Sequence, residues 1–258
     1  MGFVNAKFFY GEYVYQGKLV SVVIPCYNEE AGIRETINSL LPLGDLIDEI
    51  LVIDNNSSDR TSEVAESMGA RVVFEGRPGY GRAYKTGLAA AKGYYLATLD
   101  GDATYPADRI PDLLQILVDE KLDFVSACRK PTDWHLNIES ILRLAGNKVL
   151  TTTLWLLFFC YLIDSQSGMW VFRKDILEFV SATSDGMPFS EELKIEIFTH
   201  PHINAREVPI VFRYHDRQGS SKLSLWSDGF NNLFFLFKKR LGLLDKSSSA
   251  DFNITDTK

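Results

Sequence analysis

The sequence predicts an α/β protein built on a mostly parallel sheet with helices on both faces. Short runs of apolar and β-branched residues alternate along the chain with stretches of helical periodicity. The runs are apolar at nearly every position, as in strands that are buried on both faces. Polar clusters follow the runs, and ligands of such sheets bind at the carboxyl ends of the strands.

The elements can be placed in chain order. Strands are predicted at residues 19–27, 49–55, 70–76, 94–100 and 122–129, with helices between them, clearest at 29–41 and 107–121. The polar clusters "PCYNEE", "DNNSSDRT", "GRPGYGRAYKTG" and "DGDATYP" follow the first four strands in turn. We therefore expect four loops to converge on one edge of the sheet.

Composition excludes some classes of protein. The 258 residues can form one large α/β domain, and the net charge of −7 argues against a general nucleic-acid binder, which needs a basic surface. Cys26, Cys128 and Cys160 form no CxxC pair, so they indicate reduced thiols in a cytoplasmic protein.

Two carboxylates mark the end of the fourth strand. Asp100 and Asp102 stand on alternate residues, so in an extended backbone they point the same way and repel each other. Asp54 ends a neighbouring strand, and such oxygens suit a hard divalent cation that bridges to a diphosphate. We expect Mg²⁺ or Mn²⁺ here. The alternatives are a solvent-exposed acidic turn and, for "NNSSDRT", a helix cap made by Asp59 or Ser58.

A family resemblance rests on five segments in order. "VVIPCYNEE", "VIDNNSSDRT", "LDGDATYP", "DSQSGMWVFR" and "REVPIVFRYHDRQGSSKL" resemble inverting family 2 glycosyltransferases with the GT-A (Rossmann-like) fold, over about residues 20–222. Among these, the chain looks most like the polyprenyl-phosphate sugar transferases, the dolichyl-phosphate mannose synthase group. The resemblance implies a GT-A domain at residues 19–222.

The same resemblance implies an activity. It is metal-dependent, inverting transfer of a hexose, mannose or glucose, from GDP-mannose or UDP-glucose to a membrane polyprenyl (dolichyl) phosphate. Two alternatives stay open: transfer to a hydroxyl of a cell-surface glycan, and a catalytically silent relative that only binds nucleotide sugars.

The resemblance also implies roles for individual residues. The nucleotide sugar would be bound by Pro25, Tyr27, Asn28, Glu29, Asp54, Asn56, Asp100, Gly101, Asp102, Arg217 and Lys222. The metal ligands would be Asp100 and Asp102, and the acceptor phosphate would lie among Arg129, Arg143 and Asn147. Asp102 and Arg129 are thus the expected catalytic residues, and Asp164, Gln166 and Ser167 would close the site over the sugar.

The C-terminal part predicts contact with a membrane surface. An amphipathic helix is expected at residues 223–245, with Trp226, Phe230, Leu233, Phe234, Phe237, Leu241 and Leu244 on one face. Residues 205–240 hold seven Lys/Arg and three Asp/Glu, a local charge of +4 that suits an anionic surface. A core helix is the alternative. Residues 149–163 are too few to span a bilayer, so they predict a buried or interfacial helix and a peripheral enzyme on the cytoplasmic face.

The two terminal segments and a pair of glutamates complete the predictions. Residues 1–18 are an aromatic N-terminal extension, and residues 246–258 a disordered tail. Glu191 and Glu192 are the carboxylates left for a general base. An alcohol acceptor needs such a base, whereas a phosphate is already largely a dianion near pH 7. We therefore expect neither glutamate to titrate in the rate profile.

Overall fold

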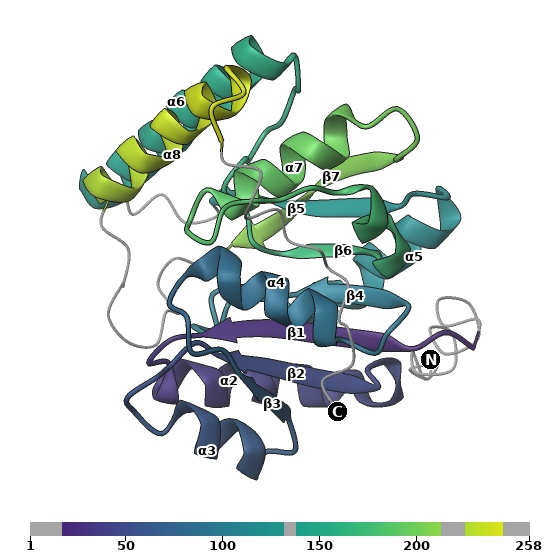
Figure 1. The fold of residues 1–258 in the computed structure, drawn as a ribbon. Helices are drawn as coiled ribbons and strands as arrows, with labels where there is room; N and C mark the ends of the chain where they lie inside the picture. Colours follow the sequence, from purple (N-terminus) through teal and green to yellow (C-terminus); the bar gives the residue numbers. More distant parts are fainter. Residues whose placement is uncertain (1–16, 132–137, 213–224, 245–258) are drawn as a thin grey trace.

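The computed structural model describes residues 17–131, 138–212 and 225–244, which form a sheet between two layers of helices, with a pair of helices at one end (Figure 1). The strands are β1 (Val20–Cys26), β2 (Glu49–Asp54), β3 (Arg71–Phe74), β4 (Tyr95–Thr98), β5 (Phe124–Pro131), β6 (Trp170–Arg173) and β7 (Ala205–Phe212). The α-helices are α2 (Glu30–Leu40), α3 (Thr61–Ser67), α4 (Tyr80–Ala90), α5 (Ile110–Asp119), α6 (Ile138–Phe158), α7 (Phe189–Thr199) and α8 (Leu225–Arg240). Both the N-terminal extension up to residue 16 and the predicted tail lie outside the described residues.

The described strands belong to one sheet, in the order β3-β2-β1-β4-β6-β5-β7. β6 is antiparallel to its neighbours β4 and β5, and the other pairs are parallel. The predicted α/β class with a mostly parallel sheet is confirmed. β1 to β5 fall within or close to the five predicted ranges, and β6 follows the "DSQSG" segment. The sequence analysis does not predict β7, which pairs with β5 at the edge of the sheet.

Alternate residues of the strands supply the cores on the two faces of the sheet. Val22 and Ile24 of β1 pack with α2, α3 and α5, whereas Val23 packs on the opposite face with α4 and α7. Because successive side chains of a strand point to opposite faces, a strand covered on both sides is apolar at consecutive positions. This arrangement explains the unbroken apolar runs in the sequence.

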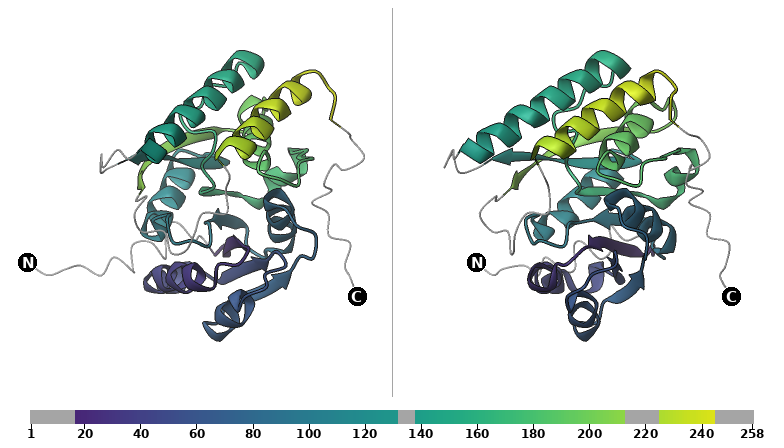
Figure 2. Two further views of the ribbon diagram at one scale, coloured as in Figure 1. Left: turned by 90° about the vertical axis from the view of Figure 1, so that its left-hand side faces the viewer. Right: turned by 60° about the vertical axis from the view of Figure 1, so that its left-hand side comes forward.

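α6 and α8 lie side by side at one end of the molecule (Figures 1 and 2). The prediction of one helix over residues 149–163 is wrong at both ends, because α6 begins at Ile138 and ends at Phe158. Beyond it the chain is non-helical and its side chains alternate, with Cys160 and Leu162 buried and Phe159, Tyr161 and Ile163 exposed. A continuous apolar run does not distinguish a helix from an extended segment.

The predicted aromatic face of α8 points away from the core. Phe230, Phe234, Phe237 and Leu241 are between 45% and 68% exposed. On the other side of the helix Leu236 is fully buried and packs in a small cluster with Leu150 and Leu154 of α6. The alternative of a core helix is therefore wrong for this face. The Trp226 side chain lies outside the described residues, and Leu233 and Leu244 are half-buried.

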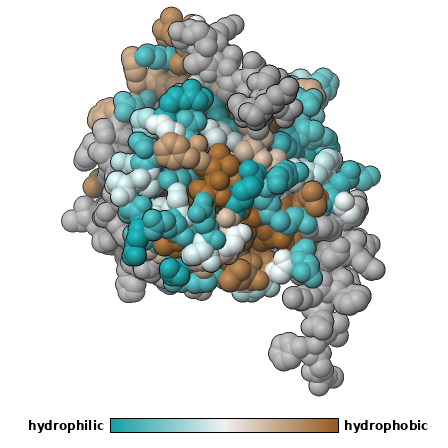
Figure 3. Space-filling view, turned by 60° about the horizontal axis from the view of Figure 1, so that its bottom comes forward, coloured by the Kyte–Doolittle hydropathy of each residue, from teal (hydrophilic) through white to brown (hydrophobic). Residues whose placement is uncertain are grey.

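Hydrophobic residues also occur elsewhere on the surface. In the view of Figure 3 they gather near the centre of the face, among hydrophilic residues. Since apolar atoms form a large part of any protein surface, such a group alone is no argument for a docking site. Among the helices of the described residues, none has the length and apolar character needed to cross a bilayer.

Truncation of a side chain should lower the free energy of unfolding much more on the inner side of α8 than on its outer side. Leu236→Ala removes a fully buried side chain, so we expect the free energy of unfolding to fall by about 2–4 kcal/mol. Phe234→Ala, at a position 62% exposed, should change it by less than about 0.5 kcal/mol. Urea unfolding followed by circular dichroism measures both. A larger loss for Phe234→Ala would place the aromatic face in the core.

Candidate active site

A pocket of about 460 Å³ opens where the carboxyl ends of the strands meet. Each of the first four strand-end loops contributes to its wall, as Tyr27, Asn55, Gly79 and Asp100 illustrate. The predicted convergence of these loops is confirmed. The predicted site residues that line the pocket are Pro25, Tyr27, Glu29, Asp100, Gly101, Asp102 and Arg129, together with Gln166.

The turn that carries the two aspartates is held tightly against the end of β1 and the start of α2, where a Cβ at Gly32 would lie 2.5 Å from the Gly101 carbonyl oxygen. A Cβ at Gly101 would lie 2.5 Å from the Cys26 sulfur, so no larger residue fits between the aspartates. Asp102 is 8% exposed and accepts hydrogen bonds on Oδ1 from the Thr104 hydroxyl (2.7 Å) and backbone N–H (3.2 Å). Thr104 therefore orients Asp102.

The pKa of the Cys26 thiol reflects the negative charge around this turn. Burial raises the pKa of the Cys26 thiol well above its ordinary value, and the charges of Glu29, Asp54, Asp100 and Asp102 raise it further. Several carboxylates therefore act on one small volume, which favours a bound cation.

The carboxylates of this turn fit a divalent metal. Among the described residues no cluster of three or more His, Cys, Asp and Glu side chains could hold a metal alone. Mg²⁺ is commonly bound by one or two carboxylates plus the phosphates of a substrate. Asp100 and Asp102 supply that pair on the pocket wall, and a diphosphate would supply further oxygens.

The loop after β2 is folded by its own polar residues. Asp54 is 6% exposed, and its carboxylate accepts from the Ser57 N–H (3.0 Å) and the Ser62 hydroxyl (2.5 Å). Asp54 is not among the residues that line the pocket, so its expected role in nucleotide binding stays a prediction. Asp59 accepts the N–H of Thr61, the first residue of α3, but the N-cap residue is Arg60 and no side chain caps the helix, so the expected N-cap by Asp59 or Ser58 is wrong.

Asn28 and Asn56 belong to the same two loops. Asn28 holds the loops together, because its amide oxygen accepts the N–H of Ser58 at 2.7 Å and its own N–H donates to the Ser57 hydroxyl. Asn56 has a φ of 62° and is exposed. Neither lines the pocket. The contacts of Asn28 are with the loops, and contact of either residue with the nucleotide remains a prediction.

Asn55 is a site residue that the sequence analysis missed. Its side chain is 5% exposed, donates to the carbonyl oxygens of Glu75 and Arg77, and accepts the N–H of Gly79 at 2.8 Å. It thereby fixes the loop before α4 at the pocket wall. Its place directly after Asp54 at a strand end is the signal that could have identified it.

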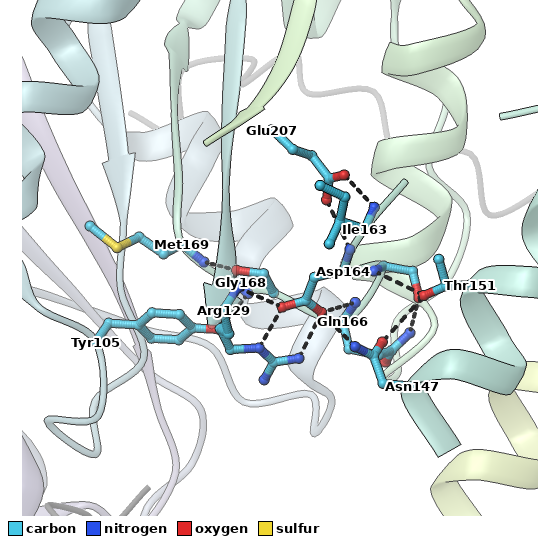
Figure 4. Close-up of polar contacts among 12 residues, drawn as sticks. Tyr105, Arg129, Asn147, Thr151, Ile163, Asp164, Gln166, Gly168, Met169 and Glu207 are labelled. Atoms are coloured by element: carbon cyan, nitrogen blue, oxygen red, sulfur yellow. Dashed lines mark hydrogen bonds and ion pairs between the residues drawn. The ribbon is translucent and has the colours of Figure 1, made fainter. Parts of the chain in front are cut away.

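Arg129 lies on the pocket wall and is held by a buried carboxylate (Figure 4). Its Nε and one terminal nitrogen donate to the two oxygens of Asp164 at 2.7 and 2.9 Å. Asn147 of α6 donates to the same carboxylate at 3.1 Å. Burial opposes ionisation of Asp164, but the charge and hydrogen bonds of Arg129 hold its pKa well below the usual range. The prediction that brings Arg129 and Asn147 together therefore agrees with the structure.

The side chains of the other three cationic residues predicted for the site lie outside the described residues. Arg143 stands one turn before Asn147 on α6, and its side chain is outside the described residues. Arg217 and Lys222 also fall outside them. Their roles remain predictions.

The "DSQSG" loop packs beneath the pocket, and only part of it reaches the wall. Gln166 lines the pocket, whereas Asp164 and Ser167 are buried below it. Tyr105 anchors the loop, because its hydroxyl accepts the N–H of Gly168 at 2.8 Å (Figure 4). Of the three residues expected over the sugar, Gln166 alone lines the pocket.

Glu191 and Glu192 are both fully buried at the start of α7, and neither lines the pocket. Glu192 accepts hydrogen bonds from Thr183 and Ser184 and pairs with Lys239 of α8 at 3.1 Å. Glu191 hydrogen-bonds Gln166, and burial raises its pKa to about 8. The expectation that neither glutamate titrates in the rate profile stays a prediction, and the raised pKa of Glu191, caused by desolvation that the sequence does not reveal, is an argument against it.

Comparisons with known proteins extend this picture. The chain is 31% identical over 229 residues to the low-salt glycan biosynthesis hexosyltransferase Agl6 of Haloferax volcanii, covering 87% of this chain and 54% of the relative. It thus spans about half the length of that protein. It is 32% identical over 212 residues to a dolichyl-phosphate hexose transferase of the same organism, covering 81% of this chain and 89% of the relative.

A solved structure gives the same result for the fold. The glucosyl-3-phosphoglycerate synthase of Mycobacterium tuberculosis, in complex with Mg²⁺ and UDP, superposes with a TM-score of 0.73 at 25% identity, over 95% of this chain and 86% of that one. The predicted GT-A type of α/β fold is thereby confirmed. Residues 21–180 match the sequence profile of glycosyl transferase family 2. With this match and the relatives above, the chain belongs to glycosyl transferase family 2.

Proposed function

We propose that the protein transfers a hexose, with inversion, from a nucleotide-diphosphate sugar to a polyprenyl phosphate. The observation that carries this proposal is the charge on the walls of one pocket, where Asp100 and Asp102 lie on the donor side and Arg129 on the other. The dolichyl-phosphate hexose transferase that is similar over 89% of its length supports the choice of acceptor.

On the donor side, Asp100 and Asp102 would hold Mg²⁺ or Mn²⁺. When bound, the cation neutralises the diphosphate and stabilises it as a leaving group. Thr104 keeps the Asp102 carboxylate oriented, and the close contact of Gly101 with Cys26 fixes the separation of the two aspartates. UDP-glucose and GDP-mannose are the candidate donors, and UDP in the similar solved structure supports the former.

On the acceptor side, Arg129 would bind the phosphate of the polyprenyl chain. Guanidinium groups suit this role because their planar fork matches phosphate oxygens. An acceptor oxygen then bonds to the anomeric carbon from the face opposite the diphosphate, whose bond to that carbon breaks, so the configuration inverts. A phosphate dianion needs no base for this attack, consistent with a pocket that neither Glu191 nor Glu192 lines.

The outer face of α8 would lie on the membrane that holds the acceptor. Phe230, Phe234, Phe237 and Leu241 are exposed there, and Lys238 and Arg240 are exposed at the end of the helix, whereas Lys239 pairs with Glu192 and Glu196. Apolar side chains beside basic ones favour the interface of an anionic bilayer. The enzyme would thus be peripheral, on the cytoplasmic face.

Transfer to a hydroxyl is the second candidate. It is favoured by the solved structure of a glucosyl-3-phosphoglycerate synthase, whose name describes a glycosylated small phosphorylated acceptor. A catalytically silent relative is opposed by the paired aspartates on the pocket wall.

The test is transfer of labelled sugar from UDP-glucose or GDP-mannose, with Mg²⁺ or Mn²⁺, into a lipid extract that contains polyprenyl phosphate. We expect a β-linked product from an α-linked donor, with release of the nucleoside diphosphate. Transfer to 3-phosphoglycerate or a glycan hydroxyl, with none to polyprenyl phosphate, would replace the first proposal with the second.

The first prediction concerns the metal. Asp102→Asn keeps the shape of the side chain but removes a charge from the proposed cation site. We expect turnover to fall by about a hundredfold or more and the metal-dependent rise in Tm with donor to disappear. Asp108→Asn changes an exposed carboxylate on a neighbouring turn and is the matched control. Near-normal activity of Asp102→Asn would contradict the assignment of Asp102 as a metal ligand.

The second prediction concerns the acceptor. Arg129→Lys keeps a positive charge beside buried Asp164 but loses the planar fork. We expect the KM for polyprenyl phosphate to rise about tenfold, with donor binding changed less than about twofold. Steady-state kinetics and donor titration measure these values, with Arg109→Lys, which pairs with Asp112 at the surface, as control. An unchanged acceptor KM would contradict the role of Arg129.

The third prediction concerns the membrane. Phe234→Glu with Phe237→Glu places two anions on the exposed face of α8, where they should not disturb the core. We expect the variant to stay folded and to lose binding to anionic vesicles in a flotation assay. Wild-type binding should weaken as salt rises. Undiminished binding by the folded variant would show that this face does not dock.

A further inference from the structure

Gln166 connects the pocket wall to two helices behind it. Its amide nitrogen donates to Oε1 of Glu191 on α7, and its amide oxygen accepts from Nδ2 of Asn232 on α8 at 3.0 Å. Both partners are buried, Glu191 at 0% and Asn232 at 3% exposure. The amide of a pocket residue is therefore oriented by side chains that do not themselves line the pocket.

These two partners each carry an oxygen that lacks a hydrogen-bond donor. Within the described part of the chain, the buried Oε2 of Glu191 and the buried Oδ1 of Asn232 accept nothing. A buried acceptor without a donor is costly, and a buried ionised carboxylate with one bare oxygen is more so. The two orphan oxygens belong to residues that contact the same amide, so one additional proton in this region would remove much of the penalty.

The cations nearby are engaged elsewhere. Lys194, three residues along α7, is fully buried and donates to the backbone oxygen of Asp164 at 2.7 Å. Arg129 pairs with the Asp164 carboxylate, and Lys239 of α8 pairs with Glu192 and Glu196. Across the described residues no ion pair joins Glu191 to a cation.

We propose that Glu191 is a neutral carboxylic acid in the folded protein and, with Asn232, acts as a positioning residue that holds Gln166 at the pocket wall. Protonation removes the charge from a buried carboxylate whose Oε2 accepts no hydrogen bond from the described residues. Desolvation agrees with the geometry, since burial raises the pKa of Glu191 to about 8 although Gln166 and Lys194 act in the opposite direction. The role at the pocket rests on the proposed transfer reaction, whereas the protonation state does not.

The sign of the pH dependence follows from this state. An exposed glutamate in the unfolded chain has a pKa of about 4.3, so the folded chain binds more protons between that value and about 8. The contribution of Glu191 to stability is complete at low pH and is lost as the pH rises through this window. Burial lowers the pKa of Lys194 to about 8, but this lysine is present in both proteins compared below.

Glu191→Gln is the decisive variant, because a glutamine is neutral at every pH and offers both a donor and an acceptor. We expect the Tm of Glu191→Gln relative to wild type to increase between pH 5 and pH 8. The infrared difference spectrum, wild type minus variant at pH 7, should contain the C=O band of a protonated carboxylic acid. Glu192→Gln is the matched control on the adjacent residue, which pairs with Lys239, and should show no such band.

Kinetics test the positioning role. We expect wild-type turnover to fall above pH 8, where Glu191 ionises, and Glu191→Gln to show no such fall. At pH 7 Glu191→Gln should retain most turnover, whereas Glu191→Ala should lower kcat by about tenfold. Absence of the infrared band, or equal losses for the two variants, would overturn the proposal. If Glu191→Ala does not fold, the kinetics of Glu191→Gln and the infrared difference spectrum still test the proposal. If the wild type transfers no sugar to polyprenyl phosphate, the proposed function fails, but the spectrum and Tm comparison remain valid.

Discussion

The second half of the molecule depends on one buried ion pair, between Arg129 and Asp164. Asp164 is 2% exposed, and its carboxylate joins β5 through Arg129 and α6 through Asn147. Its backbone is held from β7 by Glu207 and from α7 by Lys194. Four elements from distant parts of the sequence thus meet at one residue. Removal of one partner from such a pair typically costs about 3–5 kcal/mol, because the other charge stays buried.

This ion pair also divides the electrostatics of the pocket. Of the residues that line the pocket, Glu29, Asp100 and Asp102 come from loops of the first half of the chain, and Arg129 comes from β5. The carboxylates suit a cation with its diphosphate, and the guanidinium suits a second anion. Because Asp164 fixes the guanidinium, an incoming phosphate would meet a preorganised donor rather than a mobile one. α8 adds a physical link, since its outer face is apolar while Asn232 on its inner side contacts Gln166.

Local patterns predicted much of this structure. The strands of the first half and the rim where their loops meet follow from apolar runs and the polar clusters that end them. The place of Asp100 and Asp102 on the pocket wall followed from their alternate spacing at the end of an apolar strand. β7 was missed because "REVPIVF" interrupts its apolar pattern with charge and proline, and it forms by pairing with β5 over eight residues. The end of α6 was missed because the apolar run continues beyond Phe158. The burial of Glu191 at the start of α7 depends on tertiary packing, which no local pattern encodes.

We propose that an anion, not an alcohol, accepts the sugar in this pocket. The most direct measurement compares polyprenyl phosphate with the unphosphorylated polyprenol of the same chain length, using one donor and metal and identical vesicles. We predict rapid transfer to the phosphate, a rate that follows the dianion fraction around its second pKa of about 6, and no transfer to the alcohol. Equal or faster transfer to the alcohol would contradict this proposal, because the reaction would then need a general base, and neither Glu191 nor Glu192 lines the pocket.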